Sequence, residues 1–314
     1  MIFNSNPLVY DIVIGIFGLL VGSFLNVVIY RVPAMMDREE QDWHHDYTTK
    51  NVQSRAEVAS AGTQSRKEIT SAESKPFNLM QPASSCPKCD APIKPHQNIP
   101  ILSYLFLRGR CANCGVSIPL RYPAIEALTC IMSMLVAWKF GFSVACAGAL
   151  ILTWTLIALT FIDFDRQWLP DRITLPLMWI GLGFSLLTTE DGGIIFTGPR
   201  ASIIGAMAGY LSLWTVYKAF KLVTGKEGMG YGDFKLLAAL GAWFGWQVLP
   251  IIILLSAVVG LIAAVAMIIF RGHNRQVPIP FGPYLAAAGF IVLLWGSELL
   301  TIWLGGGIPN GTLQ

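Results

Sequence analysis

The sequence predicts an all-α polytopic membrane protein with about eight transmembrane helices and one small polar insert. Of the 314 residues, 54% are hydrophobic and 13% are charged, which is about half the charged share of an ordinary soluble domain. The apolar residues gather in stretches of about 20, the length that crosses a bilayer. The charges gather elsewhere, because residues 31–122 hold 21 of the 41 charged residues.

This composition excludes several classes of protein. The mean hydropathy of +0.56 rules out a disordered chain, and six cysteines are too few for a disulfide-stapled scaffold of this length. A net charge of +3 is too small to indicate a nucleic-acid partner. So much apolar surface would not stay in solution, so the expected environment is a lipid bilayer.

The first predicted span covers residues 8–30 and forms a first segment, 1–30. It lacks the basic start of a secretory signal and is longer than the apolar core of one, so it is expected to remain as a transmembrane helix. Seven further apolar stretches follow the insert and make up a multi-span helical core over 123–304. They cover 123–140, 143–162, 172–188, 200–221, 233–247, 249–270 and 282–304, and residues 305–314 form a short tail.

The Lys and Arg residues predict the orientation, because short cytoplasmic loops carry an excess of them. The first ten residues contain neither, whereas Arg31 and Arg38 follow the first span. This places the N-terminus and the tail in the periplasm and the insert, 31–122, in the cytoplasm. Lys139 and Arg200 lie at predicted outer ends of spans and are exceptions to the rule.

The insert divides into two parts. Residues 37–75 carry 14 charges of mixed sign and few apolar residues, too few to offset the entropy of ordering a packed core. Residues 37–80 are therefore interpreted as a polar linker, either solvated chain or a surface helix. Residues 83–117 contain four of the six cysteines and form a separate module.

The four cysteines form two CxxC pairs, Cys86 with Cys89 and Cys111 with Cys114, separated by 21 residues. Two such turns complete a tetrahedral four-thiolate shell, which is typical of structural zinc because no coordination position stays open. Asp90 and Gly115 follow the pairs and tolerate the positive φ of a tight turn. The alternative is two redox pairs or unrelated thiols, although a reducing cytoplasm keeps thiolates available for metal.

Two aspartates lie where an apolar run begins or ends. Asp163 ends the run 143–162, and Asp233 begins the run 233–247 after Gly230 and Gly232, which let the backbone approach another segment closely. Ionisable residues at such positions are costly and therefore functional candidates. Both aspartates are predicted on the cytoplasmic side, so they can face each other.

Two nearby carboxylates are not equivalent to this pair. Asp171 follows Pro170 and has the pattern of a helix N-cap, so a structural role is favoured. Asp165 stands beside Arg166, where a solvated role and a catalytic role are equally supported.

Residue chemistry leaves two readings of the pair Asp163 and Asp233 open. Two carboxylates that share a proton can activate water for peptide hydrolysis, but they can equally relay protons in a carrier. In a hydrolase, the helix dipoles favour Asp233, near a helix N-terminus, as the ionised base and Asp163, at a C-terminus, as the protonated acid.

Several motifs together resemble a known family. Residues 230–233 read Gly-Tyr-Gly-Asp and are similar to the GxGD signature of intramembrane aspartyl proteases. With Ile162-Asp163, the set resembles the bacterial type IV prepilin peptidases (prepilin leader peptidase/N-methyltransferases). The further matching segments are 22–27, Tyr30-Arg31 with Pro33, both CxxC pairs, 98–104, 121–123 with Glu126, and 280–283.

The resemblance implies two activities in the bacterial inner membrane. Members of the family remove the short basic leader of prepilins and pseudopilins of type IV pili and type II secretion at the cytoplasmic face, between a Gly and usually a Phe. They then methylate the new N-terminal amine with S-adenosylmethionine. The family motif places the catalytic aspartates at Asp163 and Asp233, but it indicates no methyl-transfer residue here, and residues 37–80 match no motif.

Two rival functions remain as alternatives. One is a multi-span carrier or secretion-machine subunit that uses the aspartate pair as a proton relay. The other is a transmembrane methyltransferase whose aspartates are only structural.

Overall fold

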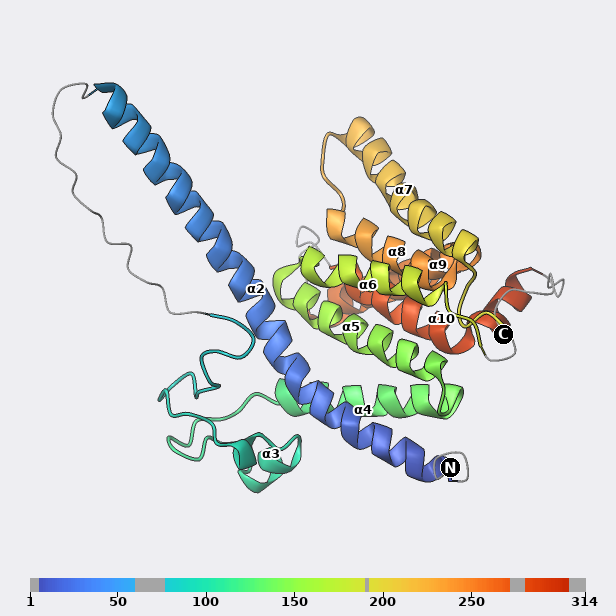
Figure 1. Ribbon diagram of the computed structural model, residues 1–314, viewed down its shortest axis with the longest axis horizontal. Coiled ribbons are helices and arrows are strands. Elements are labelled where there is room, and N and C mark those ends of the chain that lie inside the picture. The colour runs from blue at the N-terminus through green and yellow to red at the C-terminus, as the bar shows by residue number, and fades with distance from the viewer. Residues whose placement is uncertain (1–5, 60–76, 190–191, 272–279, 305–314) are drawn as a thin grey trace.

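The computed structural model describes residues 6–59, 77–189, 192–271 and 280–304, and within these ranges every regular element is a helix (Figure 1). The two short 3-10 helices are η1 (Pro95–Asn98) and η2 (Trp246–Val248). The α-helices are α2 (Pro7–Ala59), α3 (Leu102–Phe106), α4 (Arg121–Phe140), α5 (Val144–Arg166), α6 (Asp171–Phe184), α7 (Pro199–Thr224), α8 (Tyr231–Phe244), α9 (Leu249–Arg271) and α10 (Gly282–Trp303).

Each of the eight apolar stretches in the sequence lies largely within a helix. Five helical segments are long and apolar enough to cross a membrane: 7–44, 121–140, 144–166, 246–267 and 282–303. This confirms a multi-pass membrane protein, but it does not confirm the predicted count of eight spans. Helices α6 and α8 have 14 residues each and reach about 21 Å at 1.5 Å per residue, which is shorter than a bilayer core of about 30 Å.

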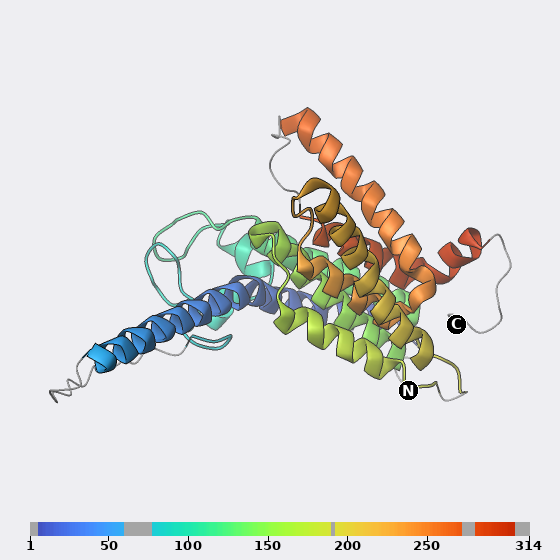
Figure 2. The same ribbon diagram turned by 90° about the horizontal axis from the view of Figure 1, so that it is seen from above.

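Helix α2 continues far beyond the end of the first predicted span at Tyr30. It runs without a break to Ala59 and projects well past the other helices (Figures 1 and 2). Its polar half begins with two ion pairs to the bundle, Asp37 with Arg166 at 3.3 Å and Glu39 with Arg172 at 2.5 Å. Residues 37–59 of the predicted polar linker are therefore helical, whereas 60–76 lie outside the described residues, as does the predicted tail 305–314.

Small residues bring the helices close together. A Cβ atom at Gly22 of α2 would lie 2.8 Å from the Cα atom of Glu126 in α4, and one at Gly18 would lie 3.1 Å from the Cα atom of Cys130. The spacing of Gly18 and Gly22 is the small-xxx-small pattern by which membrane helices approach backbone to backbone. The same occurs between α7 and α8, where Gly209 lies against the backbone of Leu237.

Helix α8 forms the centre of the bundle. Eleven of its 14 residues are buried, from Asp233 to Phe244, and it packs against α6, α7 and α10. A helix that is apolar all round belongs in a core. Helix α9, by contrast, stands away from the bundle in Figure 2 and exposes apolar side chains, among them Leu254, Leu261 and Ile262, as expected of a surface in contact with lipid.

Candidate active site and cysteine cluster

The candidate active site lies where one end each of α5, α8 and α10 meet. Asp163 is in the last turn of α5 and Asp233 is in the first turn of α8. Gly282 begins α10, and its backbone N–H donates a hydrogen bond of 3.0 Å to Oδ2 of Asp163. These helix ends lie on the same side of the bundle as α3 and the segment that carries the cysteines (Figure 1).

The two aspartates are both buried and act on each other. Asp163 is 4% exposed and Asp233 is 8% exposed. Their carboxyl groups are close enough for an electrostatic interaction between them. Two like charges in such a place repel each other, so the pair favours a state in which one carboxyl group holds a proton. The structure thus brings together the two residues that the sequence singled out.

Leu169 links the segments around this pair. It lies in the turn between α5 and α6 and is 3% exposed. A Cβ atom at Gly232 would lie 2.7 Å from Leu169 Cβ, and one at Gly282 would lie 3.1 Å from Leu169 Cδ1 and 2.6 Å from Oδ2 of Asp163. Gly232 and Gly282 are therefore positions where only a hydrogen atom fits. Leu169 was not identified from the sequence, because nothing in the turn Gln167-Trp168-Leu169-Pro170 marks it as the residue that contacts both glycines.

Gly230 differs from Gly232. It is the N-cap of α8, with φ −79° and ψ 148°, a conformation open to any residue. A Cβ atom there would meet nothing closer than 3.9 Å, which is Oδ2 of Asp233. The close approach that the sequence analysis expected of both glycines therefore applies to Gly232.

The neighbouring carboxylates Asp165 and Asp171 are bound in ion pairs outside the buried pair. Arg121 of α4 donates to both oxygens of Asp165 at 2.6 Å. Lys235 donates to both oxygens of Asp171, at 2.6 and 2.7 Å. Asp171 is the first residue of α6 and not its N-cap, a position that Pro170 takes. Its side chain is occupied by the pair with Lys235 and caps no backbone N–H.

The four cysteines of the insert come together in one cluster. The sulfur atoms of Cys86, Cys89, Cys111 and Cys114 all lie within 4.8 Å of one another and could hold a metal ion. Each pair lies in a turn closed by two backbone hydrogen bonds, with Cys86 N donating to Ala91 O and Cys111 N donating to Val116 O in the equivalent places.

The turns confirm a detail of the sequence analysis. Asp90 and Gly115 occupy the equivalent position after each pair, with φ of 52° and 69°. These are the positive φ values expected of a tight turn in which Asp and Gly are tolerated.

Hydrogen-bond donors near the cluster favour the thiolate form of two of the cysteines, the form that binds a metal cation. The N–H groups of Cys114 and Asn113 lower the pKa of the Cys111 thiol to about 6. The hydrogen bond from the Asn113 side chain is the main cause that lowers the pKa of Cys89. The pKa of Cys114 is raised to about 11: the backbone of Val116 lowers it, but burial and the neighbouring thiols outweigh that effect. Four adjacent thiolates need a cation among them, since like charges disfavour ionisation.

Two buried charged side chains fix the insert to the helical bundle. Arg31 of α2 is 8% exposed and donates to the carbonyl oxygens of Asn78, at 2.9 Å, and Pro82, at 2.6 Å. Glu126 of α4 is also buried, and its Oε2 accepts the backbone N–H of Ile101 at 2.8 Å. Both residues stand in segments that match the family, but these contacts could not be found from the sequence, because each residue acts on backbone groups far away along the chain.

Comparison with known protein families identifies the family of this chain. Residues 16–140 match the bacterial peptidase A24 N-terminal domain, and residues 150–265 match the type IV leader peptidase family. The chain belongs to the type IV leader peptidase family. The two matched regions divide it after α4, so that α2, the insert and α4 form the first region and the aspartates lie in the second.

Several bacterial relatives in this peptidase family are similar over nearly their whole length. A prepilin leader peptidase/N-methyltransferase of Aeromonas hydrophila is 50% identical over 297 residues, which cover 95% of this chain and 94% of the relative. Proteins of the same name from Pseudomonas aeruginosa and Neisseria gonorrhoeae are 47% identical over 300 residues and 50% identical over 278 residues. The aligned residues cover 96% of this chain and 95% of the Pseudomonas protein, and 88% of this chain and 88% of the Neisseria protein. No solved structure matches the chain significantly.

Proposed function

We propose that the protein is an aspartyl endopeptidase of the membrane that removes the leader of type IV prepilins and pseudopilins and then methylates the new N-terminus. The observation that carries this proposal is the buried pair Asp163 and Asp233 at the meeting point of three helix ends. Family membership and the names of the relatives give the substrate class. The carrier alternative is less well supported, because the pair lies at the ends of helices and not along a path through the bundle.

In the proposed mechanism, one carboxyl group acts as the general base and the other as the general acid. Asp233, in the first turn of α8, takes a proton from a water molecule, which attacks the scissile carbonyl carbon. Asp163, in the last turn of α5, supplies a proton as the C–N bond breaks and the amine leaves. The helix dipoles favour this assignment of the two roles, and the N–H of Gly282 fixes the orientation of Asp163.

We further propose that the cysteine cluster holds structural zinc. Tetrahedral zinc with Zn–S bonds of about 2.3 Å places its sulfur ligands about 3.8 Å apart, and the sulfur atoms of Cys86 and Cys114 lie 3.8 Å apart. All four ligands are protein thiolates, so the metal would cross-link the two turns of the insert and take no part in catalysis.

Methyl transfer from S-adenosylmethionine is proposed from the names of the relatives alone. The described residues contain no strand followed by a glycine-rich loop, the arrangement that holds many nucleotides. No residue is therefore assigned to the methyl donor, and no step is derived for it.

The proposed location is the bacterial inner membrane, with the N-terminus in the periplasm and the insert in the cytoplasm. The distribution of Lys and Arg supports this orientation. The helix ends that carry the aspartates then face the cytoplasm, where the basic leader of a substrate begins.

The experiment that tests the function is cleavage of a purified prepilin by the full chain in detergent, read by mass spectrometry. We expect loss of the leader in buffer alone and a further gain of one methyl group only when S-adenosylmethionine is added. Persistence of the intact prepilin with a correctly folded enzyme would contradict the peptidase. Cleavage without any methyl gain would contradict the second activity and leave the first intact.

A further inference from the structure

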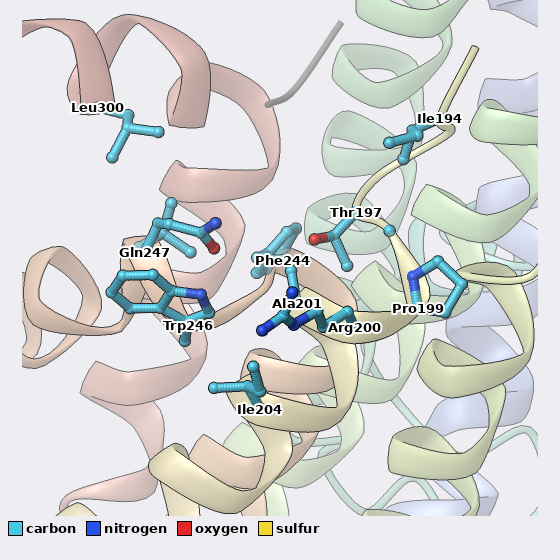
Figure 3. Close-up of a pocket in the computed structure, with 12 residues that line it drawn as sticks. Ile194, Thr197, Pro199, Arg200, Ala201, Ile204, Phe244, Trp246, Gln247 and Leu300 are labelled. Carbon is cyan, nitrogen blue, oxygen red and sulfur yellow. The ribbon is translucent and has the colours of Figure 1, made fainter. Parts of the chain in front are cut away.

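A cavity of about 640 Å³ lies at the end of α8 remote from Asp233. Figure 3 shows the residues that line it. It opens between the start of α7, the end of α8 and η2. Asp233 is at the start of α8 and Phe244, in the cavity wall, is at its end. Eleven residues of helix separate the two by about 16 Å, so the cavity is no part of the candidate active site.

Polar side chains converge in this cavity. Thr197 is 8% exposed, and within the described ranges its hydroxyl has no hydrogen-bond partner. Thr197 Oγ1 and Gln247 Oε1 each lie 2.8 Å from the point where a Cβ atom of Gly245 would be, and Figure 3 shows both groups directed toward the space between them. Because buried polar groups nearly always have a partner, the hydroxyl of Thr197 indicates a ligand.

The start of α7 makes the cavity favourable for an anion. This helix has 26 residues, begins with Pro199 after the N-cap Gly198 and has no side chain that caps its first N–H groups. Free N–H groups and the helix dipole attract negative charge at such an end. Arg200, the second residue of the helix, adds a full positive charge and extends toward Trp246 in Figure 3.

Arg200 is also unusual in its position. Arg200 and Lys139 are the two cations that the sequence places at the outer ends of spans, although Lys and Arg are usually in excess on the cytoplasmic side. Lys139 pairs with Glu298 at 3.1 Å, whereas Arg200 has no ion pair to a described residue. An anion from outside the chain would complete the same arrangement at Arg200.

The rest of the cavity wall is apolar, so the cavity suits a ligand with both a polar and an apolar part. Apolar side chains from five segments line it beside the polar groups: Ile194, Ile204, Phe244, Trp246 and Leu300. None of its described lining residues is acidic, so the ammonium of a zwitterionic headgroup would find no carboxylate. The volume lies within the range of small-molecule sites and suits a headgroup with the first part of its chains.

We propose that this cavity binds an anionic glycerophospholipid of the phosphatidylglycerol type. The phosphodiester lies at the start of α7 beside Arg200, and the glycerol hydroxyl groups of the head reach Thr197 and Gln247. The acyl chains follow the apolar wall into the bilayer. The lipid links α7 to η2 and stabilises the end of α8, the helix that carries Asp233 in its first turn.

Native mass spectrometry of the full chain in detergent tests this proposal. The protein is titrated with phosphatidylglycerol, with phosphatidylethanolamine of the same chains and with inorganic phosphate. We expect adducts of phosphatidylglycerol at concentrations at least tenfold below those of phosphatidylethanolamine. Arg200→Gln should weaken the adduct by at least about tenfold, the size of a charge-assisted contact, and Thr197→Val should weaken it severalfold. Lys139→Gln, at the same end of the bundle, should have no effect.

Other outcomes overturn the proposal. Equal adducts of the two lipids, or unchanged binding by both Arg200→Gln and Thr197→Val, would show that no specific headgroup site exists. Binding of inorganic phosphate that depends on Arg200, without a lipid adduct, would assign a site for free anions in place of a lipid. Arg200→Lys should recover part of the binding, which separates loss of the contact from loss of the fold.

Discussion

The substitution Gly232→Ala, compared with Gly230→Ala, tests how the candidate active site is built. A Cβ atom at Gly232 would lie 2.7 Å from Leu169 Cβ, about 0.8–1.3 Å closer than ordinary van der Waals contact. The Cβ atom of Leu169 is fixed to its backbone and cannot turn away. The start of α8 must therefore move, and Asp233, the next residue, moves with it away from Asp163.

The expected magnitudes follow from this displacement. Overpacking of this kind costs about 1–3 kcal/mol, and the gain of alanine over glycine in a helix returns about 1 kcal/mol, so the protein should still fold. A shift of about 1 Å between catalytic groups costs on the order of 10²-fold in rate. Gly230→Ala should keep cleavage within a few fold of the parent, because a Cβ atom there meets nothing closer than 3.9 Å.

The assay is the initial rate of leader removal by each purified variant, with thermal unfolding measured in parallel. Equal rates for Gly232→Ala and the parent protein would refute the claim that Leu169 fixes the position of α8. Equal losses in both variants would also refute it, because Gly230→Ala introduces no close contact and should therefore lose little activity.

Three further predictions concern the insert and its surroundings. Cys86→Ser should lower the bound zinc per chain at least tenfold by elemental analysis, because it removes one of four thiolates, whereas Cys130→Ser should leave the zinc content unchanged; equal contents would contradict the zinc site. Arg31→Met should expose the segment at residues 78–82 to proteolysis, because two hydrogen bonds of about 1.5–3 kcal/mol each are lost. Arg38 lies over the ring of Phe77 at 3.8 Å, whereas Arg31 lies 5.8 Å from the same ring. Arg38→Met removes this cation–π contact, worth about 0.5–1 kcal/mol, and should leave the segment nearly as resistant as in the parent; equal cleavage in both variants would contradict the role of Arg31. Lys235→Met should change the free energy of unfolding by less than about 1 kcal/mol, since the pair with Asp171 is partly exposed, and calorimetry that found a much larger loss would contradict this.

The sequence predicted the features that depend on local patterns. Apolar stretches placed the helices because their length and composition suffice to indicate a span. Asp163 and Asp233 were visible because they stand at the ends of such stretches, and the cysteine cluster because the CxxC spacing itself places two thiols side by side.

Features that depend on contacts between distant residues could not be predicted. The polar residues after Tyr30 have no apolar periodicity, and helix α2 continues there with support from Asp37 and Glu39, whose partners lie more than 120 positions away. Leu169 and Arg31 act through groups in other segments, which no spacing along the chain reveals. The number of spans stayed open for a related reason: α6 and α8 have only 14 residues each, and α8 is buried by its neighbours.

Four single variants test whether Asp163 and Asp233 together cleave the leader. Leader removal from a prepilin is measured for Asp163→Asn, Asp233→Asn, Asp165→Asn and Asp171→Asn under identical conditions. We expect the first two variants to lose cleavage by at least about 10²–10⁴-fold, and the last two, whose carboxylates are held in ion pairs, to retain it. Substantial cleavage by a folded Asp163→Asn or Asp233→Asn variant would contradict a catalytic role for that aspartate.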